Sequence, residues 1–381
     1  MDKMKPNIRQ ITGLFAAAIL LLATGCTDEN PIEDPTPQSA ERLYILNDGV
    51  YGTNNASLSV LDLKTGSVTA DIFSAANGFP LGDTANDILV LEDRIAIAVN
   101  GSNIIQICDL DGKSIASTEA VPNVRKLVAD EQNGFLYATS YADDGYVAKL
   151  SLEDCRLVSK AKVGYEPEGI VLYEGKLFVA NTGGYAYLGG HGYEQTVSVV
   201  DAETMEVTGT IDTGMKNLYG AFLQNEKYPE YLLVNAAGDY WESPAGAVII
   251  DCRTCSVVES FDFPATYAAT LGDSFFTIGS EYDAASNGYT FHTNRIRVGA
   301  EGISTEPGLA PEGGSADDGI VKAVKEMGSP SGIFIDSDGS VFVADSGDYV
   351  NRGSVHRFGA DGSFVGKYAV GVCPGHMARN R

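Results

Sequence analysis

Basic residues are scarce in this sequence, and their shortage excludes one class of partner. The 381 residues contain 26 lysines and arginines against 51 aspartates and glutamates, which gives a formal net charge of −25 at pH 7. Nucleic acids bind proteins that neutralise their phosphates, so a chain this acidic would repel them. We therefore expect no nucleic-acid partner; the charge instead keeps a surface protein soluble.

Histidine and cysteine are also rare, and neither forms a recognisable catalytic or metal-binding pattern. The four histidines fit no Ser–His–Asp arrangement and no metal motif; they are His191, His292, His356 and His376. Cys252 and Cys255 have metal-knuckle or redox spacing, but no second close cysteine pair completes a zinc site. In an exported protein they form either a turn disulfide or a reduced pair.

The acidic residues give only weak signals for a site of their own. The spacing of Asp345 and Asp348 is weak evidence for calcium. The carboxylates are numerous enough to leave a glycosidase pair open. We predict no catalytic residue, no metal and no cofactor, and hence a protein that is not an enzyme.

The sequence has an apolar run at residues 14–23, but this run is too short to cross a bilayer as a permanent helix. Lys3, Lys5 and Arg9 precede this run, and small residues follow it directly before Cys26. This order resembles a bacterial lipoprotein signal, in which Cys26 is lipidated. The alternative is an ordinary secretory peptide with an unrelated cysteine.

The residues after Cys26 are acidic and rich in proline, which is typical of an extended tether rather than packed structure. Acidic residues at this place resemble the surface-export signal of Bacteroidetes lipoproteins; a plain acidic linker is the alternative. We therefore predict a signal peptide at residues 1–26, a tether at residues 27–41 and a folded domain at residues 42–381. The domain would hang from the outer membrane by acyl chains, facing the exterior, without spanning the bilayer.

The folded part is built from a repeated unit, which is clearest at residues 330–367. Four short apolar runs separated by Gly and Asp turns predict four strands joined as a meander. One such sheet is too small to bury its own faces and needs copies around an axis. Related units recur at intervals of roughly 40–50 residues, the period of propeller blades, and we count seven. The predicted fold class is an all-β, seven-bladed β-propeller of four-stranded blades.

The two ends of the repeat array predict how the ring closes. The first blade begins at residue 42 with what reads as a second strand, whereas Pro374–Arg379 reads as a first strand with nothing after it. Pairing the two would seal the ring and remove two open edges. Blades two to five are expected at residues 85–119, 123–163, 168–213 and 219–263. Blade six starts near residue 266, and its segment 320–327 reads either as a helical turn or as the outer strand.

Tyrosine, asparagine and the single tryptophan concentrate in the loops after the second strands, where ten of the 19 tyrosines fall. These loops and the blade-to-blade loops open on one face of a propeller. Tyr and Trp give stiff contact area with a polar tip, and Asn adds donors and acceptors. Taken singly, Tyr also favours strand ends for structural reasons. Taken together, they predict a binding surface for a large, neutral, partly flat molecule with polar edges. The expected ligand-binding residues are Tyr51, Asn54, Asn55, Phe79, Asn100, Tyr141, Tyr165, Asn181, Tyr185, Tyr187, Tyr193, Tyr219, Tyr240, Trp241, Tyr282, Tyr349, Asn351 and Arg352.

Several short motifs in the first two blades carry a family resemblance. Asn47-Asp48-Gly49, the segments at residues 54–59 and 81–87, and residues 99–102 resemble a Bacteroidetes family of surface lipoprotein propellers, YncE-like in fold, that includes the BtuG cobalamin-capture proteins. The last blade resembles an NHL-type repeat. The resemblance implies non-covalent capture of cobalamin (vitamin B12) or a related corrinoid at the outer-membrane surface. It also implies delivery to a TonB-dependent transporter of the BtuB type. A glycan-binding surface lipoprotein is the rival function, and a propeller hydrolase or lyase is a third.

Overall fold

The computed structural model describes residues 41–379, except residue 189, residues 284–287, residue 314 and residues 316–317. The chain divides after residue 39, and all of the described residues belong to the second unit. The predictions of a signal peptide and of lipidation at Cys26, and all but the last residue of the predicted tether, lie outside the described residues.

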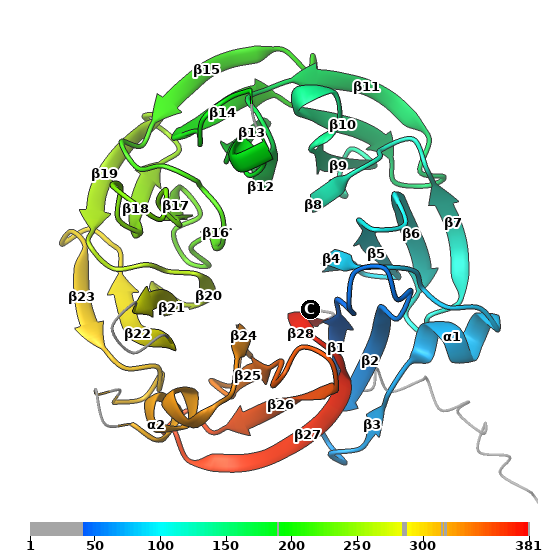
Figure 1. The fold of residues 1–381 in the computed structure, drawn as a ribbon, viewed down its shortest axis with the longest axis vertical. Coiled ribbons are helices and arrows are strands. Elements are labelled where there is room, and N and C mark those ends of the chain that lie inside the picture. Colours follow the sequence, from blue (N-terminus) through cyan, green and yellow to red (C-terminus); the bar gives the residue numbers. More distant parts are fainter. Residues whose placement is uncertain (1–40, 189, 284–287, 314, 316–317, 380–381) are drawn as a thin grey trace, which may run out of the picture. The chain divides into compact units, whose positions relative to one another are not determined.

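The second unit is a ring of seven four-stranded antiparallel sheets, so the prediction of a seven-bladed β-propeller is confirmed (Figure 1). The innermost strands are β28 (Pro374–Arg379), β4 (Ala85–Val90), β8 (Val124–Asp130), β12 (Pro167–Tyr173), β16 (Phe222–Gln224), β20 (Tyr267–Leu271) and β24 (Pro330–Ile335). The second strands are β1 (Arg42–Asn47), β5 (Arg94–Val99), β9 (Phe135–Ser140), β13 (Lys176–Asn181), β17 (Tyr231–Ala236), β21 (Ser274–Asp283) and β25 (Val341–Asp345).

The third and outermost strands complete each blade in chain order. The third strands are β2 (Ser57–Asp62), β6 (Ile104–Asp109), β10 (Tyr146–Ser151), β14 (Thr196–Asp201), β18 (Gly246–Asp251), β22 (Gly288–Arg297) and β26 (Arg352–Phe358). The outermost strands are β3 (Val68–Thr69), β7 (Ser114–Thr118), β11 (Leu157–Lys162), β15 (Val207–Asp212), β19 (Ser256–Phe261), β23 (Ser304–Pro307) and β27 (Phe364–Val372).

Burial follows directly from the position of a strand within its blade. The middle strands lie between two neighbouring blades and are buried on both faces, so they read as near-continuous apolar runs such as residues 95–99. Outer strands such as β11 alternate between exposed and buried residues. The hydrophobic clusters sit between adjacent blades; one joins Ile105 and Ile107 to Leu136 and Leu150 of the next blade. Each blade therefore depends on both neighbours for its stability.

The ring closes as the sequence predicts, by pairing the last strand with the first blade. β28 runs antiparallel to β1, with Leu43 opposite Arg379 and Ile45 opposite Met377. Arg379 also forms an ion pair with Asp336, which follows β24. The first blade thus has the order β28-β1-β2-β3, and each of the seven described blades contains four strands.

Within the described residues, two α-helices and two 3₁₀ turns lie outside the sheets. Helix α1 (Ile72–Asn77) lies at its outer edge, and helix α2 (Gly319–Glu326) packs against β22 (Figure 1). The segment at residues 320–327 is therefore mainly helical, capped by Asp318, whose side chain accepts from the Val321 amide. η1 (Ala142–Asp144) and η2 (Ala186–Leu188) lie in loops. No helix within residues 41–379 as described is long and apolar enough to span a membrane.

The cysteines of the described residues are all free thiols, including Cys252 and Cys255. The sequence leaves open a disulfide or a reduced pair at Cys252 and Cys255, and the structure has the reduced pair. Burial raises the pKa of the Cys252 thiol to about 12, which keeps it protonated and unreactive at neutral pH.

Candidate functional site

The strand registers place two sets of loops on one face of the ring, as predicted. Asn181 at the end of β13 lies opposite Pro167 at the start of β12 and Thr196 at the start of β14. Because every blade repeats this antiparallel pattern, loops leaving the second strands and loops entering the next blade reach the same side. We call this side the loop face.

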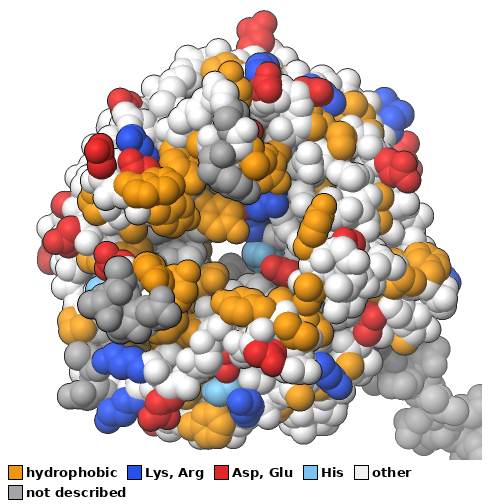
Figure 2. All heavy atoms as spheres, in the orientation of Figure 1, with side chains coloured by type: hydrophobic (Ala, Val, Ile, Leu, Met, Phe, Trp, Pro, Cys, Tyr) orange, Lys and Arg blue, Asp and Glu red, His pale blue; other side chains and the backbone are white. Residues whose placement is uncertain are grey.

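The loop face carries most of the exposed aromatic side chains that the structure describes. Those from the predicted set are Tyr51, Tyr165, Tyr185, Tyr219, Tyr240, Trp241, Tyr282 and Tyr349. Tyr51 and Trp241 are each 81% exposed, far more than packing within the domain would leave such rings. Figure 2 shows hydrophobic side chains gathered around a central opening, with acidic, basic and histidine side chains inside it. A clustered, exposed aromatic surface of this kind marks a binding site.

Aromatic rings from the third, fourth and fifth blades pack against one another in two groups. Tyr193 packs edge-on against Tyr240 at 6.2 Å, and Tyr240 packs edge-on against Trp241 at 6.5 Å. Tyr185 packs in the same way on Tyr141, with 5.2 Å between ring centroids. Edge-to-face pairs at these distances are favourable, so neighbouring blades are joined by ring contacts at two places, between the third and fourth blades and between the fourth and fifth.

The loop that carries Tyr240 and Trp241 is fixed by one carboxylate. The Oδ1 atom of Asp239 accepts from the backbone amides of Trp241, Glu242 and Ser243 at 3.1, 2.8 and 2.7 Å. Lys216 Nζ lies 3.0 Å from Oδ2 of the same carboxylate. These hydrogen bonds, the Ser243 amide first, hold the pKa of Asp239 well below its usual range. The loop is therefore preorganised, which reduces the entropy cost of binding.

Inside the aromatic rim lies a cavity of about 730 Å³ that residues of all seven innermost strands line. Tyr51, Tyr219 and Tyr349 belong both to the rim and to the cavity lining. The volume lies within the range of small-molecule sites. The cavity is therefore large enough for a small molecule or for part of a larger one.

One wall of the cavity contains a buried ion pair. Arg125 on β8 donates two hydrogen bonds to Glu168 on β12, at 2.7 and 3.1 Å. Tyr141 donates to the same carboxylate at 2.7 Å, and the Arg125 guanidinium lies 4.7 Å from the Tyr141 ring centre. Burial opposes ionisation of Glu168, but the charge and hydrogen bonds of Arg125 outweigh it and lower its pKa. This group is internally neutral and stiffens the wall.

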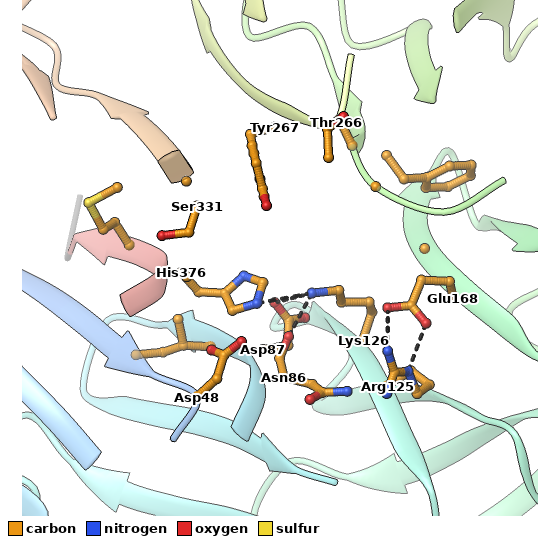
Figure 3. A pocket seen from close by; sticks show the side chains of 18 of the residues that line it. Asp48, Asn86, Asp87, Arg125, Lys126, Glu168, Thr266, Tyr267, Ser331 and His376 are labelled. Carbon is orange, nitrogen blue, oxygen red and sulfur yellow. Dashed lines mark hydrogen bonds and ion pairs between the residues drawn. The ribbon is translucent and has the colours of Figure 1, made fainter. Parts of the chain in front are cut away.

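A second polar group joins strands from three blades (Figure 3). Lys126 on β8 donates to the Asn86 carbonyl at 2.6 Å and lies 3.3 Å from Nε2 of His376 on β28. Oδ1 of Asp87 on β4 is 4.0 Å from the Lys126 ammonium. Burial, and then the charges of Lys126 and Arg125, lower the pKa of His376 well below its usual range. His376 is therefore neutral, and its Nε2 atom accepts a hydrogen bond from the Lys126 ammonium.

Asp48, in the loop after β1, completes this side of the cavity. Its carboxyl points toward Asp87 and His376 in Figure 3, and its Oδ1 atom is buried without a hydrogen-bond partner among the described residues. Burial raises the pKa of Asp48 to about 7, although the charges of Lys126 and Arg125 oppose the rise. A carboxyl with this pKa exists in both protonation states near neutral pH.

The opposite side of the cavity carries no ionisable carboxylate or ammonium. Phe222 from β16, Tyr267 from β20 and Ser331 from β24 line it. Ser331 donates to the Pro374 carbonyl at 2.6 Å. Burial raises the pKa of Tyr267, which keeps its hydroxyl protonated. The cavity therefore has a charged half and an uncharged half.

Several predicted ligand-binding residues instead support the loops. Tyr141 is buried behind Glu168, and Asn181 is buried with its amide bound to Thr196 and Ser198. The side chain of Asn55 accepts from the Val50 amide, and Asn100 donates to the Val124 carbonyl. These side chains shape the loop face from within.

Other members of the predicted set lie away from the cavity or take part in turns. Phe79 packs edge-on against Phe73 of α1, at the outer edge of the ring. Asn351 caps its own turn by donating to Asp348, and Arg352 Nε donates to the Val370 carbonyl. Asn54 is exposed in the loop after β1. The side chain of Tyr187 lies outside the described residues.

Sequence reasoning missed the charged half of the cavity. Its members on strands occupy the second or third positions of the innermost strands, as in Pro167-Glu168 and Pro374-Gly375-His376. The variation of residue type at these repeated positions is the signal that would have found them. No cluster of three or more His, Cys, Asp or Glu side chains suited to a metal ion occurs among the residues that the structure describes.

Comparisons with known proteins show the fold and no family. No family model and no curated protein matches the sequence. Solved structures do match. A protein of unknown function from Desulfotomaculum acetoxidans superposes with a TM-score of 0.62 at 10% identity, over 89% of this chain and 98% of that one. A quinoprotein alcohol dehydrogenase-like protein from Bacteroides thetaiotaomicron gives 0.60 at 13%, over 90% and 79%.

Hydrazine synthase from Kuenenia stuttgartiensis gives a TM-score of 0.57 at 15% identity, over 75% of this chain and 87% of that one. Such low identities show a shared propeller architecture only, because one fold serves many functions. The resemblance of residues 47–102 to the cobalamin-capture family stays a prediction.

Proposed function

We propose that this protein captures cobalamin or a related corrinoid non-covalently at the outer-membrane surface and passes it to a TonB-dependent transporter. The observation that carries the proposal is the exposed aromatic rim around a cavity whose charges are largely paired. A corrinoid is a large, flat macrocycle edged with carboxamide groups. Aromatic rings fit the flat macrocycle, and paired polar groups in the cavity fit uncharged amides.

The size of the site supports a ligand that both covers the rim and enters the cavity. The rim includes rings from the loops of several blades, from Tyr51 in the first to Tyr349 in the last. A cavity of about 730 Å³ would take a projecting side group. Binding of this kind needs no catalytic residue, in keeping with the expectation that the protein is not an enzyme. Lipidation of Cys26 is the part of the proposal that rests on sequence alone.

A glycan-binding surface protein is the second candidate, because exposed Tyr and Trp rings such as Tyr240 and Trp241 also stack on sugars. Absorbance titration of the purified domain with cyanocobalamin separates the two functions. Saturable binding at micromolar or tighter affinity is expected for corrinoid capture. Absence of binding, together with retention on a polysaccharide gel, would overturn the proposal in favour of the glycan.

The aromatic rim is tested by replacing Tyr240 and Trp241 together with alanine. If these rings are central contacts, the affinity for cyanocobalamin should fall about a hundredfold, since buried aromatic anchors dominate binding energy. Phe364→Ala is the matched control, because Phe364 is an exposed ring on the outermost strand β27. Equal affinity of the double variant and the control would remove the rim from the site.

A further inference from the structure

The charged half of the cavity contains a small recess with its own chemistry. Asp48, Asp87, Lys126 and His376 come from four separate segments, the loop after β1 and the strands β4, β8 and β28 (Figure 3). The recess is distinct from the aromatic rim, because no ring of the rim contributes to these four side chains. The fold of the ring brings them together from distant parts of the sequence.

Hydrogen-bonding capacity in this recess is unused on both the acceptor and the donor side. Oδ1 of Asp48 is buried and has no partner among the described residues. An ammonium has three N–H donors, and Lys126 makes two close contacts, to the Asn86 carbonyl and to Nε2 of His376. The nearest oxygen of Asp87, at 4.0 Å, is too far for a third hydrogen bond. A buried acceptor and a donor on the same wall are therefore available to a ligand.

The balance of charges in the recess selects an uncharged group. A ligand ammonium would lie beside Lys126, and a ligand carboxylate would lie beside Asp48 and Asp87. A primary carboxamide avoids both conflicts, since its N–H donates and its carbonyl accepts from neighbouring positions. Leaving a buried acceptor unpaired is costly, so a group that satisfies Asp48 gains affinity.

We propose that the recess formed by Asp48, Asp87, Lys126 and His376 is a subsite for one carboxamide side arm of the captured ligand. Its N–H would donate to Asp48, and its carbonyl would accept from Lys126. This subsite rests on the proposed corrinoid capture and names the part of the ligand that enters the cavity. The recess would therefore distinguish a corrinoid with an intact side amide from one in which that amide is hydrolysed to an acid.

Protonation of Asp48 gives the subsite a diagnostic pH dependence. The titratable and charged groups around Asp48 are Lys126 and Arg125 from β8, Asp87 from β4, His376 from β28, the neighbouring Cys373, and Tyr219 and Tyr267 on the other side of the cavity. A carboxamide can donate to ionised Asp48 or accept from protonated Asp48, so its binding changes little with pH. A carboxylate arm needs the protonated form. Its affinity therefore falls about tenfold for each pH unit above the raised pKa of Asp48.

The test compares cyanocobalamin with its isomeric derivatives in which one side amide is hydrolysed to a carboxylic acid. Dissociation constants are measured with the whole domain at pH 6 and pH 8.5. We expect one isomer to lose at least tenfold in affinity between the two pH values, while cyanocobalamin and the other isomers change less than threefold. Uniform behaviour of all isomers, with cyanocobalamin still bound, would overturn the subsite and leave corrinoid capture intact. No binding of cyanocobalamin would overturn the capture itself.

Asp48→Asn gives an independent readout of the same subsite. Asparagine does not titrate, so the sensitive isomer should bind this variant equally at both pH values. Asp154→Asn is the matched control, since Asp154 is an exposed turn residue between β10 and β11, away from the loop face. Circular dichroism confirms folding of both variants. An unchanged pH dependence in folded Asp48→Asn, or the same change in the control, would contradict the assignment.

Discussion

The two halves of the central cavity occupy equivalent strand positions but differ in chemistry. On β28, β4, β8 and β12 the cavity wall carries His376, Asp87, Lys126 and Glu168. On β16, β20 and β24 the wall carries aromatic, aliphatic and hydroxyl side chains. The repeat thus determines where a side chain points, and the residue type at that position determines what the wall can bind. A ligand entering the cavity would meet a charged side and an uncharged side, and this asymmetry would favour one orientation.

Removing β28 would break this comparison most severely. A chain that ends before Pro374 loses the partner of β1 and the His376 side of the charged half. We expect it to lose cooperative unfolding or to melt at least 10 °C lower, because the inner edge of the first blade and two hydrophobic clusters become exposed. Thermal unfolding followed by circular dichroism measures this. A chain lacking only residues 380–381 is the control, and equal melting temperatures would refute closure by β28.

Substitutions in the charged and uncharged halves of the cavity should lower the free energy of unfolding by different amounts, because only the charged half contains a buried ion pair. Glu168→Gln leaves the Arg125 guanidinium buried without its counter-charge, and we expect a loss of about 3 kcal/mol in the free energy of unfolding. Ser331→Ala, at the equivalent position of the uncharged half, removes two neutral hydrogen bonds, one donated to the Pro374 carbonyl and one accepted from Ser346, and should cost about 1–2 kcal/mol. Urea unfolding at pH 7 compares them. Equal losses would mean that Arg125 finds another partner or water.

Asp48→Asn should change the free energy of unfolding by a smaller amount that depends on pH. The pKa of Asp48 is raised to about 7 in the folded protein. The stability that Asp48 contributes is therefore fully present at pH values below its pKa in the unfolded chain, and it is lost as the pH rises toward 7. The variant does not titrate. It should therefore be more stable than the parent by on the order of 2 kcal/mol at pH 8.5 and equally stable near pH 4. Urea unfolding at both pH values checks the sign; a gain at pH 4 would contradict it.

The architecture could be predicted from the sequence because the repeat is local. Each blade is a meander of neighbouring segments, so the strand pattern at residues 330–367 predicts the others and the strand missing from the first blade. The six-residue helix α1 was not predicted, since a segment this short carries no clear helical period. The sequence around α2 is compatible with a helical turn or a strand for a similar reason. In the structure the segment is helical, and Ile320 and Val324 are buried.

The rim and the cavity differ in how far sequence reasoning reaches. Loops after second strands can be assigned to one face by counting, so the rings of Tyr51, Tyr240 and Trp241 were predictable. The recess was not, because its contacts join residues such as Lys126 and His376 that lie 250 positions apart. Their proximity depends on the angle between blades and on closure of the ring. Neither the angle between blades nor the closure of the ring can be inferred from the sequence of a single repeat.

The position of His376 on the closing strand links assembly of the fold to assembly of the pocket. Until β28 docks, Lys126 lacks its imidazole partner and the cavity lacks one of its seven walls. Ligand uptake during refolding would therefore report when β28 has docked. A bound molecule spanning that junction would in turn hold the ring shut, so occupancy should slow its opening.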